Sequence, residues 1–286
     1  MKKLKKHKFG FYYIFPTPNK KKLEQYYENK YFDKNISYKN KLKLEEKNYH
    51  ECISLARVFM LSKKMKKLKN KNLLDLGAGK GTFLLNVKSY FNHCLGIDFS
   101  VNNLEKKSKS KIKFISMNPE HFIENDLRKF DVITLNNVLE HVPNAIYFIK
   151  KLKKNIKKSA YIILTVPNDY SDLQIETNKR VNRKNYWLCP PEHLNYFNKK
   201  NFTKFSNKTG FKVVDAISDF PIELFLLNKD FDYTRNPKLG KKIHLLRCEI
   251  MSYLKKNHSI EDIYDFLKIF YKLNIGRDNI YLLKKI

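Results

Sequence analysis

Two short motifs carry residue types that could bind a nucleoside cofactor. The first, LLDLGAGKGTFL at 73–84, places Gly77, Gly79 and Gly81 between an apolar, strand-like run and a run with helical spacing. Glycines permit tight turns and let the backbone come close to a ligand, and the first turn of the following helix offers free amide donors. A carboxylate or phosphate of a ligand could therefore bind at this turn.

The spacing of the glycines distinguishes between two kinds of cofactor. A dinucleotide fingerprint, GxGxxG, would require glycine at position 82, but this chain has Thr82 and the pattern GxGxG. The second motif is GIDFS at 96–100, which places Asp98 21 residues after Gly77, at the end of the next predicted strand. A carboxylate there can accept hydrogen bonds from both ribose hydroxyls. The two motifs together predict a nucleoside cofactor without a pyrophosphate.

The sequence around these motifs alternates between strand and helix patterns. We predict strands from about residue 72 to 76 and at 93–98, 112–116, 130–136 and 159–167, separated by helices after the glycine turn, at 101–109 and from the capping residue Asn144. This alternation is typical of a parallel sheet with helices on both faces. A helix at 201–208, with Phe202 and Phe205 facing inward and Gly210 at its end, precedes strands at 211–218 and 279–286.

In this order, LDLGAGKG, GIDFS, FDVITLNNVLEHV and AYIILTVPN resemble a class I S-adenosylmethionine-dependent methyltransferase over residues 72–167. The resemblance implies a Rossmann-like, doubly wound α/β fold with a seven-stranded, mostly parallel sheet whose last strand, 279–286, is antiparallel. It also implies S-adenosyl-L-methionine as the cofactor. The stretches at 190–213 and YYENKYFD near the start are similar to a bacterial branch that methylates small molecules and surface polysaccharides. Some members of that branch carry an N-terminal cysteine zinc module, which this chain lacks.

The resemblance also assigns residues to the methyl donor. The glycine loop would hold its methionine part, Asp98 its ribose, and Phe99 would pack on its adenine. Where the family usually has an acidic residue for the adenine amino group, this chain has Asn118, whose amide oxygen can still accept a hydrogen bond. The full set of predicted donor-binding residues is Asp75, Gly77, Ala78, Gly79, Gly81, Asp98, Phe99, Asn118, Asn136, Asn137 and Val138.

Methyl transfer from a sulfonium mainly requires that the protein hold an acceptor in line and exclude water. An alcohol acceptor would also benefit from a base, and histidine is the usual one. His193, in PPEHLNYF, and His141, in LEHVP, are the candidates, although either could instead have a structural role in its turn. Tyr186 and Trp187 could stack on a substrate ring or pack in the core.

We expect residues 1–68 to form an aromatic, basic N-terminal segment with an amphipathic helix from about Lys41 to Leu68, and residues 69–286 to form the methyltransferase domain. Within the domain, the polar stretch 168–198 is too long for an ordinary connection and is a predicted lid or substrate segment. Residues 220–276 form a predicted helical insertion. The acceptor is expected between these two segments and the ends of the fourth and fifth strands.

The formal net charge of +30 raises the question of a polyanionic partner. Only seven of the 58 basic residues are Arg, however, and recognition of base edges and phosphates relies strongly on Arg. The excess of Lys beside many Asn, Ile, Tyr and Phe residues is what an AT-rich genome produces. We therefore expect a small-molecule acceptor, a hydroxyl of a saccharide or nucleotide-linked sugar. An RNA methyltransferase and a non-catalytic donor-binding module are the alternatives; the intact glycine loop and Asp98 argue against the second.

The remaining composition bears on location and metals. The four cysteines are far apart and form no CxxC pair, so neither a metal site nor a disulfide framework is expected. No uncharged apolar run reaches the eighteen or so residues that a transmembrane helix requires. Both features favour the cytosol. The sequence carries no signal for the number of subunits.

Overall fold

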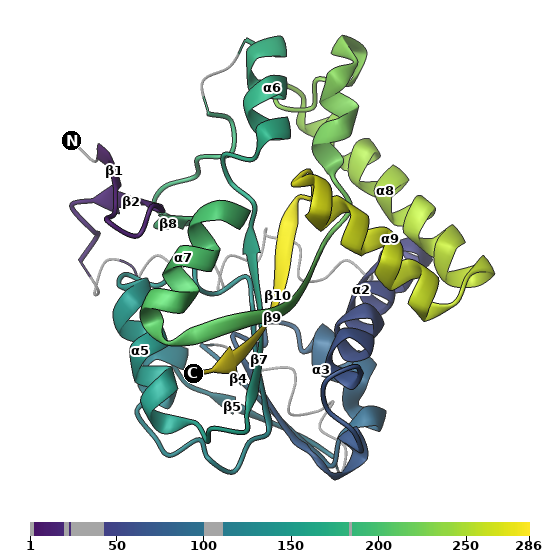
Figure 1. Cartoon of the computed structure of the whole chain (residues 1–286). Helices are drawn as coiled ribbons and strands as arrows, with labels where there is room; N and C mark the ends of the chain where they lie inside the picture. The colour runs from purple at the N-terminus through teal and green to yellow at the C-terminus, as the bar shows by residue number, and fades with distance from the viewer. Residues whose placement is uncertain (1–2, 20–22, 24–42, 100–110, 183–184) are drawn as a thin grey trace.

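A seven-stranded sheet forms the centre of the protein (Figure 1). The computed structural model describes residues 3–19, 23, 43–99, 111–182 and 185–286. The strand order is β5-β4-β3-β6-β7-β10-β9, in which β3 to β7 are parallel and β10 is antiparallel to both β7 and β9. The strands are β3 (Asn72–Leu76), β4 (His93–Asp98), β5 (Ile112–Ser116), β6 (Val132–Asn136), β7 (Tyr161–Pro167), β9 (Phe211–Ser218) and β10 (Asp278–Lys285). The predicted fold class, with an antiparallel last strand, is confirmed.

Helices cover both faces of the sheet. Neighbouring residues of each strand point to opposite sides, and because both sets are apolar, each face needs a covering layer. In β7, Ile163 belongs to one apolar cluster and Ile162 to the other. The first face is covered by α2 (Leu44–Ser62), α3 (Thr82–Val87), α8 (Pro237–Asn257) and α9 (Ile260–Leu273), and the second by α5 (Ala145–Asn155) and α7 (Lys199–Thr209) (Figure 1). Shorter elements are α4 (Pro119–Phe122), α6 (Asp172–Arg180), η1 (Leu68–Asn70), η2 (Lys88–Tyr90), η4 (Ile222–Leu227) and η5 (Lys229–Phe231).

The helix ends show the predicted capping. The Asn144 side chain accepts a hydrogen bond from the Tyr147 amide at 3.0 Å at the start of α5. Gly210 ends α7 with φ 89°, in the left-handed region that glycine tolerates best. The predicted helix at 101–109 lies outside the described residues. None of the helices in the described ranges is both long and apolar enough to cross a membrane.

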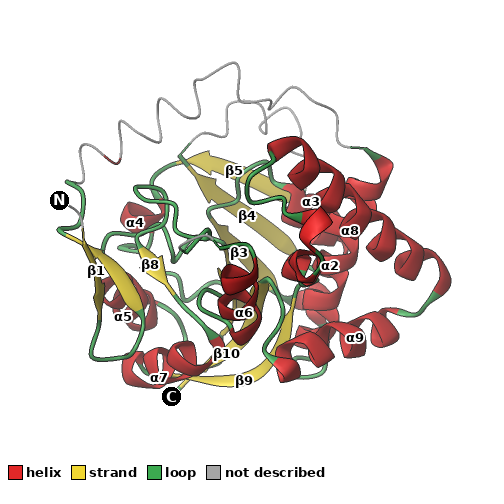
Figure 2. Ribbon diagram, turned by 90° about the horizontal axis from the view of Figure 1, so that it is seen from above, coloured by secondary structure: helices red, strands yellow, loops and turns green. Residues whose placement is uncertain are grey.

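The first residues form a hairpin that the sequence pattern did not predict. Strands β1 (Lys3–Lys6) and β2 (Tyr12–Phe15) pair with each other, and β2 also pairs with β8 (Asn195–Tyr196) in a three-stranded sheet. This sheet lies on the side of α5 and α7, opposite α8 and α9 (Figure 2). Phe11 is buried against Phe197, with ring centroids 4.9 Å apart. The partner strand is more than 180 residues away in sequence, so no local periodicity could reveal the pairing.

Residues 168–198 contain more regular structure than expected from their polar sequence. Helix α6 begins at Ser171, whose side chain accepts a hydrogen bond from the Gln174 amide. The buried face of α6 is partly polar: the Gln174 side-chain amide donates to Glu223 at 3.1 Å, and Thr177 is fully buried. Because polar side chains occupy buried positions, the apolar spacing that normally predicts a helix is missing.

Candidate functional site

The glycine loop between β3 and α3 is attached to the neighbouring strand β4. The amides of Gly77 and Ala78 both donate to the Ile97 carbonyl, at 2.8 and 3.0 Å. Gly77, Gly79 and Gly81 have φ of 76°, 52° and 69°. A Cβ on Gly77 would lie 2.4 Å from Val138 Cγ2, whereas a Cβ on Gly79 would meet no atom within 4 Å. The loop is thus packed against protein at Gly77 and open at Gly79.

Asp75 lies in β3 directly before this loop and is buried. Its Oδ1 atom accepts hydrogen bonds from Thr134 Oγ1 at 2.5 Å and from Asn136 Nδ2 at 3.2 Å. Burial raises the pKa of the Asp75 carboxyl to about 7, although the Thr134 hydroxyl and the Arg57 guanidinium oppose the shift. Asp75 is therefore a carboxylate that would gain from a cationic ligand.

Asp98, at the end of β4, lies beside the loop as predicted. Its Oδ2 atom accepts the Gly79 amide at 2.8 Å, and its side chain is buried. Phe99 follows with 36% of its surface exposed. Asn118 caps α4, because its Oδ1 atom accepts the Glu120 amide at 2.8 Å. The oxygen expected to meet an adenine amino group therefore already has one protein donor, although a carbonyl oxygen can accept two.

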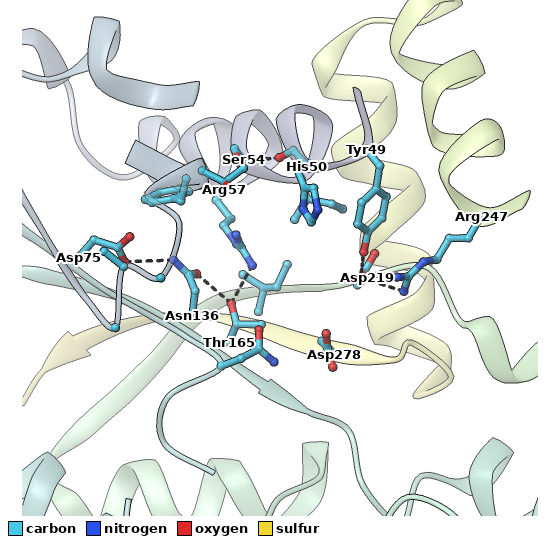
Figure 3. A pocket seen from close by; sticks show the side chains of 18 of the residues that line it. Tyr49, His50, Ser54, Arg57, Asp75, Asn136, Thr165, Asp219, Arg247 and Asp278 are labelled. Atoms are coloured by element: carbon cyan, nitrogen blue, oxygen red, sulfur yellow. Dashed lines mark hydrogen bonds and ion pairs between the residues drawn. The ribbon is translucent and has the colours of Figure 1, made fainter. Parts of the chain in front are cut away.

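A cavity of about 390 Å³ opens in front of the glycine loop (Figure 3). Of the residues predicted to bind the donor, those that line it are Asp75, Gly77, Ala78, Gly79, Asn136 and Asn137. Its other walls come from α2, the ends of β7 and β9, helix α8 and the start of β10. The lining residues from these elements are Tyr49, His50, Ile53, Ser54, Arg57, Thr165, Asp219, His244, Arg247, Asp278 and Ile280.

Comparison with known proteins agrees with this geometry. A family model for a methyltransferase domain matches residues 45–216, which include the glycine loop, Asp98, five strands of the large sheet and most of β9. The chain belongs to this methyltransferase family. A domain of this family catalyses the transfer of a methyl group.

Two known proteins are similar to this methyltransferase. It is 33% identical over 121 residues to a ubiquinone biosynthesis O-methyltransferase from Pelagibacter ubique, a match that covers 40% of this chain and spans about half (50%) of that relative's length. It also resembles the crystal structure of a SAM dependent methyltransferase from Archaeoglobus fulgidus, with a TM-score of 0.51 and 16% identity over 82% of this chain and 94% of the other. The second similarity shows the fold.

The methyltransferase does not place its two candidate histidines in the cavity lining. His141 and His193 lie together, with ring centroids 4.9 Å apart. The backbone amides of Leu194 and Asn195 donate to the Glu140 carbonyl at 2.7 and 3.0 Å. These bonds tie the segment that carries His193 to the turn after β6. None of the described residues of 168–198 lines this cavity, and the lid or substrate role predicted for that segment stays a prediction.

The carboxylate of Glu140 lies beside His141 and His193. His141 Nε2 lies 3.8 Å from Glu140 Oε1, and His141 Nδ1 lies 2.8 Å from the Glu192 carbonyl, to which it donates. Burial raises the pKa of Glu140 well above its ordinary value. The three side chains offer ligand atoms within 4.8 Å of one another, whereas bonds to one zinc ion of about 2.1 Å keep two ligand atoms within about 4.2 Å. They would have to move closer to share a metal ion.

Arg57 of α2 is a cavity residue that the sequence analysis did not identify. One guanidinium nitrogen donates to Thr165 Oγ1 at 3.1 Å, and the guanidinium carbon lies 5.7 Å from the centre of the Phe83 ring. Its buried Nε atom has no hydrogen-bond partner among the described residues. A basic residue between the buried positions Ala56 and Val58 was the available signal.

A polar cluster closes the cavity on the side opposite the glycine loop (Figure 3). The buried Tyr49 hydroxyl donates to the Asp219 carboxylate, which also lies 3.5 Å from an Arg247 nitrogen. The Arg247 guanidinium lies 4.7 Å from the centre of the Tyr49 ring and donates to His244 Nδ1 at 2.8 Å. Burial and the charge of Arg247 lower the pKa of His244, so this imidazole is neutral at pH 7. Helices α2 and α8 are thus joined through Asp219.

Proposed function

We propose that this methyltransferase transfers a methyl group to a hydroxyl of a small polar acceptor, a saccharide or a nucleotide-linked sugar. When bound, the donor supplies a methyl group on a sulfonium, which is reactive without further activation. The protein's part is to bind the donor, to hold the acceptor oxygen in line and to take up a proton.

The cavity residues fit the methionine end of the donor. Asp75 offers a carboxylate to its ammonium group, and the free Nε of Arg57 offers a donor to its carboxylate. The open space at Gly79 leaves room for close approach. Asp98 and Phe99 would hold the ribose and adenine, with Asn118 at the adenine edge. Gly77, Ala78, Gly81, Asn136, Asn137 and Val138 would complete the donor site.

The polar wall opposite the glycine loop is the observation that supports the acceptor class. It combines carboxylate, guanidinium, imidazole and phenol groups, and these can donate to and accept from several hydroxyls of one molecule. The residues of this wall are Tyr49, His50, Asp219, His244, Arg247 and Asp278. A polyhydroxyl acceptor can add hydrogen bonds to such groups, whereas an apolar one would leave unpaired those that still lack a partner, such as the buried Nε of Arg247.

A phenolic hydroxyl is the second candidate acceptor. It is favoured by the similarity to a ubiquinone biosynthesis O-methyltransferase, whose name also supports oxygen as the methylated atom. An aromatic acceptor would pack against Tyr49 or Phe83 in the same cavity. The two candidates share the hydroxyl but differ in the rest of the molecule.

Transfer of a tritiated methyl group tests the acceptor class. We would incubate the enzyme with labelled S-adenosylmethionine and with UDP-glucose, GDP-mannose, free hexoses, catechol or bulk tRNA, and separate the products by chromatography. Label on the sugar compounds is expected, with no incorporation by an Asp98→Ala variant as the control. Label on catechol alone would move the assignment to phenols, and label on tRNA alone would contradict a small-molecule acceptor.

A further inference from the structure

Asp278 lies at the carboxyl ends of the parallel strands, where ligands of open α/β folds bind. It begins β10 and is paired with Pro167, the last residue of the parallel strand β7. Because side chains alternate along a strand, Asp278 and Ile280 face the cavity, while Asn279 points to the other side and accepts a hydrogen bond from Ser218 Oγ at 2.5 Å. Figure 3 shows the Asp278 carboxylate between Thr165 and Asp219.

Three carboxylates line the cavity, and two of them are already engaged. Asp75 accepts from Thr134 and Asn136, and Asp219 accepts from the Tyr49 hydroxyl and from the Phe220 amide. No described residue donates a hydrogen bond to the Asp278 carboxylate or forms an ion pair with it. A partly buried carboxylate that faces a cavity without a donor is placed to receive one from a ligand.

Two basic residues whose charges act on Asp278 are paired with other acids. Arg277, its neighbour in the chain, lies 2.7 Å from Glu223, and Arg247 faces Asp219. These arrangements leave the Asp278 carboxylate available to a ligand rather than to a protein cation.

We propose that Asp278 is the general base that takes the proton of the acceptor hydroxyl. This inference rests on the O-methyl transfer proposed above. The acceptor oxygen forms a bond to the methyl carbon while the carbon–sulfur bond breaks, and that bond's electron pair remains on sulfur. The O–H bonding pair stays on the acceptor oxygen as the proton moves to Asp278. The products are a methyl ether, S-adenosylhomocysteine and a protonated Asp278, which returns its proton to water.

The surroundings of Asp278 suit a base. Burial raises the pKa of its carboxyl, and the charges of Asp219 and Glu223 act in the same direction, whereas Arg277 and Arg247 oppose the shift. A carboxylate with a raised pKa binds a proton more strongly than an ordinary one, which increases the driving force for proton transfer. His50 and His244 are the other candidate bases in the cavity lining; burial lowers the pKa of both imidazoles, and His244 already accepts a hydrogen bond from Arg247.

A titration in the free enzyme tests this assignment without any acceptor. Protein with 13C-labelled aspartate carboxyls would be titrated by NMR between pH 3 and 9, with and without S-adenosylhomocysteine. The resonance that disappears in the Asp278→Asn variant is expected to titrate above the ordinary aspartate value of about 3.9. Titration at or below that value would overturn the proposal, whichever acceptor the enzyme uses.

Kinetics on a methylated sugar from the panel above provide the second test. Asp278→Asn should lower turnover by about 10² or more and leave the S-adenosylhomocysteine affinity unchanged, with partial recovery in Asp278→Glu. Asp215→Asn removes a carboxylate of β9 that pairs with Lys268 outside the cavity and should keep normal turnover, as should His141→Gln and His193→Gln.

The outcomes separate this proposal from the one it rests on. Normal turnover of Asp278→Asn, or a large loss in one of the histidine variants instead, would remove Asp278 as the base. Failure of the unmodified enzyme to bind S-adenosylhomocysteine would instead contradict the proposed donor site. If no sugar is methylated, an Asp278 carboxyl that titrates at or below the ordinary aspartate value still overturns its role as the base.

Discussion

Donor binding should depend on pH through Asp75. The pKa of this carboxyl is raised to about 7 in the free protein, and the donor and S-adenosylhomocysteine share a cationic ammonium group. The ligand therefore favours the ionised carboxylate, so binding below pH 7 must release the proton. If only the ionised form binds, the affinity for S-adenosylhomocysteine falls by about tenfold from pH 8 to pH 6, as expected for one group with this pKa.

Calorimetric titration at pH 6, 7 and 8, in two buffers with different heats of ionisation, measures both the affinity and the number of protons released. About half a proton should be released at pH 7, since a group with a pKa of about 7 is then half protonated. Asp75→Asn should bind more weakly at pH 8 and show no pH dependence. The matched control is Asp169→Asn, which changes another buried carboxyl whose pKa, about 8, is raised by burial but which does not line the cavity.

The raised pKa of Asp75 also makes the free energy of unfolding depend on pH. The folded-state pKa of Asp75 lies above its unfolded value, so its contribution is fully present below about pH 4 and is lost as pH rises through 7. Asp75→Asn should therefore be more stable than the unmodified protein at pH 8, by up to about 4 kcal/mol from a shift of about three pKa units. An affinity that stays constant from pH 6 to 8, together with equal melting temperatures of the two proteins, would refute the reasoning.

Three further predictions concern the donor site and the charge. Asp98→Ala should lower donor affinity at least about tenfold, because charge-assisted hydrogen bonds of about 1.5–3 kcal/mol each are lost together with the anchor of the Gly79 amide; unchanged affinity by calorimetry would exclude Asp98 from the site. Gly79→Val should abolish donor binding at a cost of only about 1–2 kcal/mol in stability, since a side chain there meets open space, whereas Gly77→Val collides with Val138 and should lower the melting temperature much further. RNA binding, measured by filter retention, should be weak and lost by about 0.2 M salt; selective retention of one RNA under those conditions would revive the RNA methyltransferase alternative.

Local patterns were sufficient to predict the sheet and the position of Asp98 beside the glycine loop. Buried parallel strands are continuous apolar runs, and a glycine loop has a spacing of its own, so both are recorded in short stretches of sequence. The prediction that Asp98 would stand beside the glycine loop depends only on β3 and β4 being neighbours, and the hydrogen bond from the Gly79 amide shows that they are. The caps at Asn144 and Gly210 are equally local.

The histidines show where local patterns stop being informative. His193 was a candidate base because it follows β7 in a long polar segment, and such segments often cover active sites. Its direction depends instead on β8, which pairs with β2 near the N-terminus, and on the bonds from that segment to the Glu140 carbonyl. Neither partner is encoded near His193 in the sequence.

The sequence by itself determined the fold class, and it predicted the cofactor and the strand ends at which that cofactor would bind, because each follows from the spacing of a few adjacent residues. Only the tertiary structure decided what faces the donor. The cavity brings together Tyr49 of α2, Asp219 directly after β9, Arg247 of α8 and Asp278 of β10, which are up to 229 residues apart. They meet because two helices and two strand ends pack on one face of the sheet. Nothing in the sequence around these four residues distinguishes them from other polar residues. Their shared position in the lining of one cavity makes them candidate acceptor-binding residues.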